Sequence, residues 1–363
     1  MSQLTEGSFC TGINGLGIAC SGVFGSRPAW FCEYDAAPSK VLAHHYPDVP
    51  NHGDLTATDW SQVEPVDIVT AGYPCQPFST AGKRQGTDDE RHIWTAIRDA
   101  IGTLRPRYVI LENVRGHLSL GFDAVLGDLA GLGFDAEWRT VRSSDIGAPH
   151  RRERLFVLAQ HPDRVAGQTP ISQRDRAEQS GGEWPRTNTR RGATANADSE
   201  SAWRDTGATL ATENGREDEP LRSNRDRSSD GVATPADTNG SDGGPQASTG
   251  WHNVHERRVQ QERDSHRRGN RGNEGVNWGK YAAAVQRWER ITGTAAPEPL
   301  ENGKRLNPAL PQWMMGYPAG WLTDPAIGLS RAQQLRAIGN AVQSQAAALA
   351  IGSLVDRRAL VAS

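Results

Sequence analysis

Lysine is scarce in this chain of 363 residues and occurs only as Lys40, Lys83, Lys280 and Lys304. Arginine therefore supplies nearly all of the 40 basic residues, which 43 acidic residues outnumber to give a formal net charge of −3. Such a balance excludes a global basic field, so any surface that binds nucleic acid must be a local patch. Arginine suits bidentate contacts to phosphate and guanine, but a GC-rich genome explains the bias more simply.

Cysteine is also rare, and all four cysteines lie in the first quarter of the chain, at Cys10, Cys20, Cys32 and Cys75. None belongs to a C-x-x-C pair, so their spacing indicates neither a zinc site nor a thioredoxin-like motif, and we expect no metal. Four cysteines in a chain of this length do not predict a disulfide scaffold, which fits a reducing compartment.

The sequence also lacks long apolar runs. No basic segment followed by an apolar stretch opens the chain, and no apolar run approaches the length that spans a membrane. We therefore expect a cytoplasmic monomer without a membrane partner.

Residues 1–162 alternate short apolar runs with helical patterns. The runs Phe31–Glu33, Val66–Thr70 and Tyr108–Leu111 suit buried parallel strands, and Leu155–Ala159 suggests another strand. Two helical faces lie between these runs, the first formed by Ile93, Ile97, Ile101 and Leu104, and the second by Phe122, Val125, Leu126, Leu129 and Leu132. Strands that alternate with helices predict an α/β fold with a doubly wound sheet.

The composition changes sharply at Asp163–Gly275. This stretch holds one isoleucine, two leucines and no phenylalanine, tyrosine or methionine. It buries too little apolar surface to offset the entropy of ordering, so we interpret it as a polar insert of extended loops or disorder. Regular structure resumes with a helix at Tyr281–Arg290, which Gly293 terminates, and Gly339–Asn340 suggests a turn that opens a C-terminal helix.

A glycine-rich turn, Cys10–Gly17, precedes a predicted helix. Its glycines allow a ligand to approach the backbone at a helix N-terminus, the usual place for a nucleotide-like cofactor. Glu33 ends the next predicted strand, where a carboxylate accepts from ribose hydroxyls, and Asp54 stands where a third strand would end. A plain tight turn explains the pattern about equally well, and the glycine order does not match the dinucleotide motif G-x-G-x-x-G.

Cys75 gives a more specific signal. The segment Gly72–Ser79 reads G-Y-P-C-Q-P-F-S and follows a predicted strand directly. Pro74 and Pro77 stiffen the chain on both sides of the cysteine, which lies at the ligand-binding edge of a parallel sheet. A lone cysteine is more often a small buried hydrophobic residue, but this setting favours a nucleophile.

Three further segments are candidates, the first at the end of a strand and the second at the margin of the sheet. They are Leu111–Val114 with Glu112, the basic cluster Pro149–Arg154 before a strand, and the turn at Leu335–Val342. Taken singly, Glu112 is interpreted as a helix cap or a surface acid, and the basic cluster Pro149–Arg154 as a solvated surface.

Together these segments, with Leu306–Trp321, resemble in type and order the conserved motifs of the DNA cytosine-C5 methyltransferase family. The resemblance covers roughly residues 7–160 and 305–350. Two departures stand out: Asn14 replaces a usual glycine in the cofactor loop, and His150 replaces a usual glutamine in the arginine motif.

The resemblance implies a Rossmann-like methyltransferase domain, formed by residues 1–162 and completed by 329–363. Residues 163–328 are then a smaller, irregular target-recognition region that includes the polar insert. Double-stranded DNA is the implied substrate, with a cognate restriction endonuclease as a functional partner. A tRNA cytosine methyltransferase and a non-catalytic DNA-binding relative remain as alternatives.

The same resemblance assigns the site. The implied catalytic residues are Cys75 as nucleophile on cytosine C6, Glu112 as proton donor to N3, and Arg152 and Arg154 on the base and adjacent phosphate. The methyl donor is S-adenosylmethionine, and its implied binding residues are Phe9, Gly12, Ile13, Gly15, Glu33, Asp54, Asn340 and Val342. Because the reacting carbon lies inside a stacked duplex, the base must be flipped out.

Overall fold

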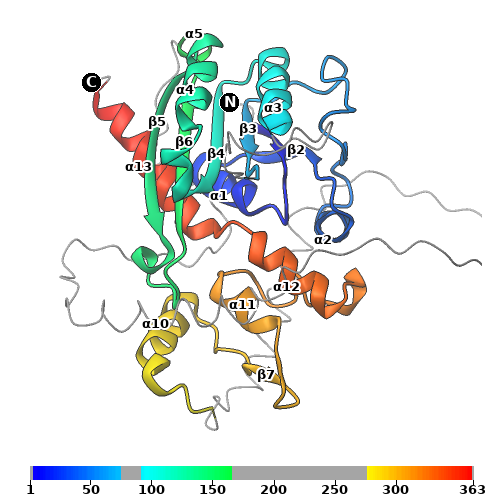
Figure 1. Ribbon diagram of the computed structural model, residues 1–363, viewed down its shortest axis with the longest axis vertical. Helices are drawn as coiled ribbons and strands as arrows, with labels where there is room; N and C mark the ends of the chain where they lie inside the picture. Colours follow the sequence, from blue (N-terminus) through cyan, green and yellow to red (C-terminus); the bar gives the residue numbers. More distant parts are fainter. Residues whose placement is uncertain (1–2, 75–90, 166–275, 362–363) are drawn as a thin grey trace, which may run out of the picture. The chain divides into compact units, whose positions relative to one another are not determined.

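A six-stranded sheet is the centre of the described part of the chain (Figure 1). The computed structural model describes residues 3–74, 91–165 and 276–361. All of them belong to one compact unit, residues 1–194 with 275–363. The predicted boundaries at 162/163 and 328/329 stay predictions, and the polar insert and Cys75 lie outside the described residues.

The strands run in the order β2-β1-β3-β4-β6-β5. Their bounds are β1 Thr5–Phe9, β2 Arg27–Cys32, β3 Ile68–Ala71, β4 Tyr108–Val114, β5 Asp135–Arg142 and β6 Glu153–Gln160. The first four strands are parallel, which the sequence predicts for β2, β3 and β4, and β6 is antiparallel to both β4 and β5. The expected third strand before Asp54 is wrong: an isolated bridge from Asn51 to Phe31 is the pairing found there.

Helices cover both faces of the sheet, because side chains along each buried strand point alternately to opposite sides. In β4, Val109 and Leu111 face α3 (Arg91–Leu104) and α4 (Phe122–Gly131), whereas Ile110 faces α1 (Gly15–Phe24) and α13 (Ser344–Val361). The doubly wound α/β fold is thereby confirmed.

The residues after the insert pack against the α1 and α13 face. Helix α10 (Ala282–Thr292) buries Trp288 completely, and the Trp288 indole donates to Trp313 O at 2.9 Å. The predicted terminator is confirmed, since Gly293 takes a left-handed conformation with φ of 68°. Short elements complete this part: η5 Gly279–Tyr281, β7 Leu300–Glu301, β8 Arg305–Leu306, α11 Ala309–Met314 and η6 Pro325–Ile327.

The C-terminal segment departs from the expected turn. Gly339 and Asn340 are the last two residues of α12 (Arg331–Asn340), and α13 begins only at Ser344. The expectation that they open the terminal helix is therefore wrong, because the non-helical residues 341–343 come between. The remaining elements are α2 Ala36–His45, η2 Arg115–Ser119, η3 Ser143–Ile146 and α5 Pro162–Val165.

Candidate active site

The glycine-rich turn after β1 meets the carboxylate of Glu33 at the end of β2. The backbone N–H of Gly12 donates to Glu33 Oε2 at 2.6 Å, and that of Asp35 donates to Glu33 Oε1 at 2.8 Å. Partial burial raises the pKa of Glu33, and the two backbone donors oppose that rise. Gly12 has a φ of 56°, and a Cβ there would meet no atom within 4 Å. The turn therefore offers open backbone beside a carboxylate, which fits a ligand with hydroxyl groups.

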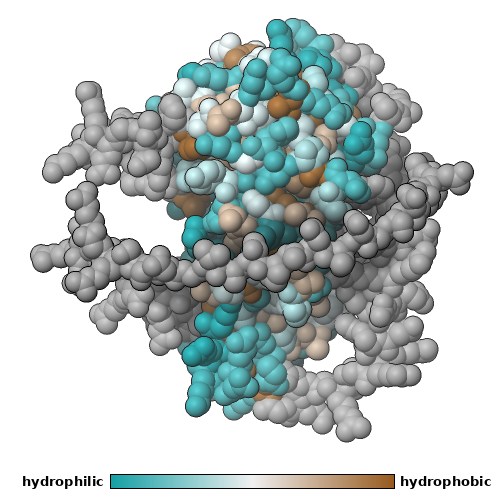
Figure 2. Space-filling model, turned by 90° about the vertical axis from the view of Figure 1, so that its right-hand side faces the viewer, coloured by the Kyte–Doolittle hydropathy of each residue, from teal (hydrophilic) through white to brown (hydrophobic). Residues whose placement is uncertain are grey.

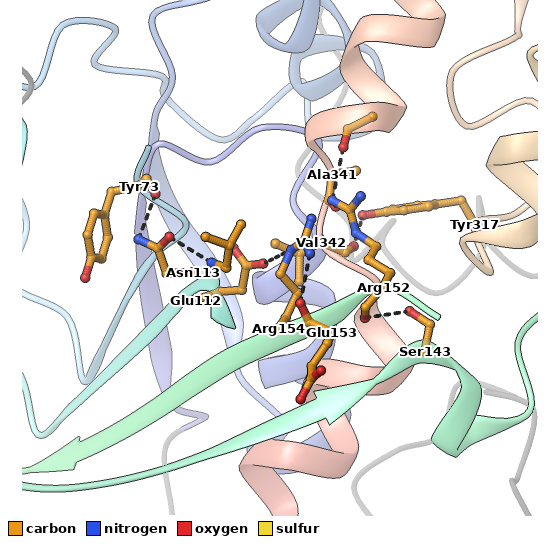
Figure 3. A network of polar contacts seen from close by, with 12 residues as sticks. Tyr73, Glu112, Asn113, Ser143, Arg152, Glu153, Arg154, Tyr317, Ala341 and Val342 are labelled. Carbon is orange, nitrogen blue, oxygen red and sulfur yellow. Dashed lines mark hydrogen bonds and ion pairs between the residues drawn. The ribbon is translucent and has the colours of Figure 1, made fainter. Parts of the chain in front are cut away.

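Gly15 is required by a close approach of the C-terminal segment. A Cβ at this position would lie 2.4 Å from Val342 O and 2.5 Å from the hydroxyl oxygen of Tyr317. That hydroxyl donates to Val342 O at 2.6 Å (Figure 3). The structure thus brings the predicted residues Gly15 and Val342 together through Tyr317, to which the sequence motif assigned no role.

The other predicted cofactor residues are placed less directly. Phe9 is fully buried between Trp30 and Trp60, and Ile13 is also buried, so contact with a ligand would use their backbone atoms. Asp54 accepts from both the N–H and the hydroxyl of Thr56, which lowers the pKa of Asp54. Asn340 is exposed at the end of α12. Their roles stay predictions.

Gly72, at the carboxyl end of β3, lies where three of the predicted segments converge. A Cβ on Gly72 would be 3.7 Å from Glu112 Oε2, 3.8 Å from Val342 Cγ2 and 3.9 Å from Cys10 O. The cofactor turn, the glutamate strand and the C-terminal segment therefore border the strand that leads to Cys75 three residues later. Cys75 itself lies outside the described residues.

Glu112 and Arg154 form the central ion pair (Figure 3). They lie on the neighbouring strands β4 and β6, and Arg154 Nε is 3.1 Å from Glu112 Oε1. Burial raises the pKa of Glu112, while the charges of Arg154 and Arg152 oppose the rise. The result is a carboxyl group with a raised pKa beside a fixed cation.

Arg152 points to the C-terminal segment instead. Its Nη2 donates to Gly339 O at 3.0 Å and to Ala341 O at 2.7 Å. Burial, together with the charge of Arg154, lowers the pKa of Arg152 to about 10. The two arginines therefore contact different partners, although the sequence assigned them one shared role.

His150 is partly buried beside these arginines, and both of its ring nitrogens are inaccessible to solvent. Neither ring nitrogen has a hydrogen-bond partner among the described residues. Burial and the two neighbouring guanidinium charges lower the pKa of His150 to about 3, so the ring is neutral.

Neither a metal cluster nor a membrane span is found in the described ranges. No three His, Cys, Asp or Glu side chains there are grouped so as to hold a metal ion. No helix of residues 3–74, 91–165 or 276–361 has the length and apolar character to cross a membrane. On the face shown in Figure 2, hydrophobic residues form separate spots among hydrophilic ones.

Comparisons with known proteins place the chain in a family. The model of the C-5 cytosine-specific DNA methylase family matches residues 4–355. A protein of Escherichia phage P1 named DNA N-6-adenine-methyltransferase is 42% identical over 146 residues, which make up 36% of this chain and 19% of that protein. Type II methyltransferase M.BsuFI of Bacillus subtilis is 31% identical over 168 residues, 44% of this chain and 40% of the relative. The matches thus span less than half the length of either relative.

A solved structure resembles the fold along the whole chain. S. pombe Dnmt2 methyltransferase superposes with a TM-score of 0.54 over 98% of this chain and 99% of its own, at 14% sequence identity. That likeness shows the fold alone, whereas the family match spans the cofactor turn, the glutamate strand, the arginine cluster and the C-terminal segment. The chain belongs to the C-5 cytosine-specific DNA methylase family.

Proposed function

We propose that this protein transfers a methyl group from S-adenosylmethionine to C5 of cytosine in double-stranded DNA, with Cys75 as nucleophile. The observation that carries the proposal is the buried Glu112–Arg154 pair beside Gly72. A carboxyl group with a raised pKa, held by a cation next to the strand that leads to a cysteine, suits acid-assisted addition of a thiolate to a ring.

The proposed reaction begins when the Cys75 thiolate adds to C6 and forms an S–C6 bond. The electron pair of the C5–C6 double bond moves to form a C4–C5 double bond, the C4–N3 pair moves onto N3, and N3 takes up the proton of Glu112. Arg154 stabilises the carboxylate that remains and supplies positive charge at the base. C5 thereby gains nucleophilic character and would take the methyl group, while the bond from that carbon to the sulfonium breaks and a neutral thioether leaves. N3 then returns its proton to Glu112, and the C5 proton is lost to a base. The C5–H electron pair restores the C5–C6 double bond as the S–C6 bond breaks, which frees Cys75 as a thiolate.

The residues around the cofactor turn fit the methyl donor. Gly12 offers open backbone, and Glu33 retains acceptor capacity for ribose hydroxyls beyond its two backbone contacts. Gly15 and Val342 close one side of the turn. When bound, S-adenosylmethionine supplies an electrophilic methyl group on a sulfonium. The assignments of Phe9, Ile13, Asp54 and Asn340 belong to the same proposal.

The substrate would be recognised outside the sheet. In this proposal residues 163–328 read the target sequence, and the base is flipped out of the duplex towards Glu112. A restriction endonuclease that cuts the same sequence would be the functional partner. The cytoplasmic location and the monomeric state stay predictions.

Adenine N6 is the competing target, because the phage P1 relative is named for it. The alignment spans only 19% of that protein, so its name need not describe the matched part. An exocyclic amine already carries a lone pair and needs no thiolate addition to its ring. The P-C-Q segment at Cys75 follows Gly72 closely in the sequence, and Gly72 lies beside Glu112, which favours cytosine C5 as the target.

The decisive experiment uses DNA that carries 5-fluorocytosine in place of cytosine. Methylation proceeds on this substrate, but C5 then has no proton to lose, so the enzyme stays bound to C6 through Cys75. We expect a complex that survives denaturing electrophoresis and requires S-adenosylmethionine, and whose yield falls as salt rises because DNA binding weakens. Fluorinated tRNA is offered in parallel.

Two variants serve as controls. Cys75→Ala should form no complex, and Cys75→Ser should lose methyl transfer while it keeps its affinity for S-adenosylmethionine. A complex that forms with tRNA but not with DNA would show that tRNA is the substrate. Methylated adenine without any covalent complex would show that the reaction is adenine methylation. No product at all would indicate a non-catalytic relative.

A further inference from the structure

Tyr73, two positions before the proposed nucleophile, forms hydrogen bonds through both its side chain and its backbone. Tyr73 follows β3 and is 7% exposed. Its hydroxyl lies 3.0 Å from Nε2 of His117, in the short helix η2 that follows β4. Its carbonyl oxygen accepts from Asn113 Nδ2 at 3.3 Å, beside Glu112 in the sequence (Figure 3). Two contacts thus connect Tyr73 to the segment that carries the proposed acid.

The direction of the first contact follows from the surroundings of His117. Its Nδ1 is 2.8 Å from Leu120 O, which can only accept, so Nδ1 carries the proton. In the neutral ring Nε2 is then an acceptor, and the Tyr73 hydroxyl donates to it. Burial lowers the pKa of His117 and keeps the ring neutral.

This polar pair lies within an apolar cluster. The Tyr73 ring packs 5.3 Å from that of Trp94, and the His117 ring packs 5.7 Å from that of Phe122. Two apolar rings of similar shape would be about as stable here, since the net gain of a buried hydrogen bond is small. What the pair adds is direction, because a hydrogen bond fixes the angle and depth of the Tyr73 ring and a hydrophobic contact does not.

We propose that His117 is a positioning residue for the nucleophile, acting through its hydrogen bond to the Tyr73 hydroxyl. Together with Asn113 it fixes the end of β3 relative to Glu112, and Cys75 follows Tyr73 by two residues in the sequence. Because reaction rates depend steeply on the placement of the attacking atom, a loosened Tyr73 slows the chemical step without weakening either substrate. The inference rests on the proposed cytosine methylation.

The test measures kcat and KM for transfer of a tritiated methyl group to unmethylated bacterial genomic DNA. Tyr73→Phe removes only the hydroxyl, and we expect kcat to fall about tenfold or more while KM for DNA and for S-adenosylmethionine stays within about twofold. Two replacements of His117 each keep a polar atom at the position of one ring nitrogen only. The amide of His117→Gln reaches the place of Nε2 and should retain most of kcat. His117→Asn keeps the place of Nδ1 and should lose as much as Tyr73→Phe.

A matched control separates positioning from stability. Asp128→Ala removes the acceptor of a 2.8 Å hydrogen bond from the Trp94 indole but leaves in place the Trp94 ring that packs on Tyr73, so it should lower the melting temperature and leave kcat unchanged. An unchanged kcat in Tyr73→Phe would overturn the proposal, as would a fall in all four variants that follows their melting temperatures. A wild-type protein that transfers no methyl group to DNA would instead reject the proposed function, and this role with it.

Discussion

Glu6 is a buried carboxyl group at the base of the cofactor turn, and its ionisation should govern the stability of the protein near neutral pH. It lies in β1, is 2% exposed and accepts a hydrogen bond of 2.9 Å from the Thr70 hydroxyl. No ion pair to Glu6 occurs within the described residues. Asn14 Oδ1, which has no hydrogen-bond partner there, and Glu6 Oε1 both lie beside Gly17.

Burial without a cation disfavours the charged form. It raises the pKa of Glu6 from 4.5 to about 7, although the Thr70 hydroxyl opposes the rise. A carboxyl group with a raised pKa is most favourable to folding when protonated, so its contribution is fully present below pH 4.5 and is lost as the pH rises towards 7. At ~1.4 kcal/mol per pKa unit, the whole loss is roughly 3 kcal/mol. About 1 kcal/mol of it falls between pH 6 and pH 8.

Glu6→Gln removes the titration and keeps the size of the side chain. We expect the melting temperature of the variant, minus that of the wild type, to increase by roughly 2–4 °C between pH 6 and pH 8. Differential scanning fluorimetry at half-unit pH steps measures both proteins in the same buffers, so groups that titrate in both cancel.

Thr70→Val provides the matched control. It removes the hydrogen bond that lowers the pKa of Glu6, so the pH window of the loss should move upwards, and Glu6→Gln in that background should remove the window again. Parallel melting curves for the wild type and Glu6→Gln across the whole range would refute the reasoning, because they would mean that Glu6 does not titrate there.

Further predictions concern the turn and the ion pair. Gly15→Ala should weaken binding of S-adenosylmethionine in calorimetry by about tenfold or more, because its Cβ has no room, whereas Gly22→Ala, with open space, should not. Asn14→Gly should change that affinity by less than about tenfold, and a complete loss would show direct contact with the ligand. Arg154→Ala should cost about 1–3 kcal/mol in urea unfolding, since Glu112 stays buried without its cation, and Glu112→Gln in that background should recover most of it.

The parts of the fold predicted correctly were those with strong local patterns. The apolar runs that form β2, β3 and β4 are typical of strands that helices cover on both faces of a sheet. Strand β5 was missed because Asp135–Arg142 is an edge strand whose polar and charged residues dilute the period of two. The antiparallel course of β6 was also unpredictable, since strand direction depends on how the chain returns to the sheet and not on the strand's own residues.

Motifs identified the candidate site, and packing decided how its side chains pair. Glu112 and Arg154 were singled out from separate segments, and the register of β4 with β6 brings them into contact. The hydrogen bond between Tyr73 and His117 had no sequence signal, because a histidine five residues after Glu112 is equally consistent with a solvated loop. Contacts of this kind depend on distances between segments that lie far apart in the sequence.

The separate partners of the two arginines suggest how the site keeps its charges apart. Arg152 donates to the backbone carbonyls of Gly339 and Ala341 and so ties the C-terminal segment to β6, at the place where Val342 meets the cofactor turn. Arg154 is then the cation that contacts Glu112. His150 beside them is neutral, so the pair is not disturbed by a third charge that would compete for the carboxylate. A second cation bound to the same oxygens would lower the pKa of Glu112 further and oppose the proton donation proposed for it, so the backbone contacts of Arg152 leave Arg154 as the cation on this carboxyl group.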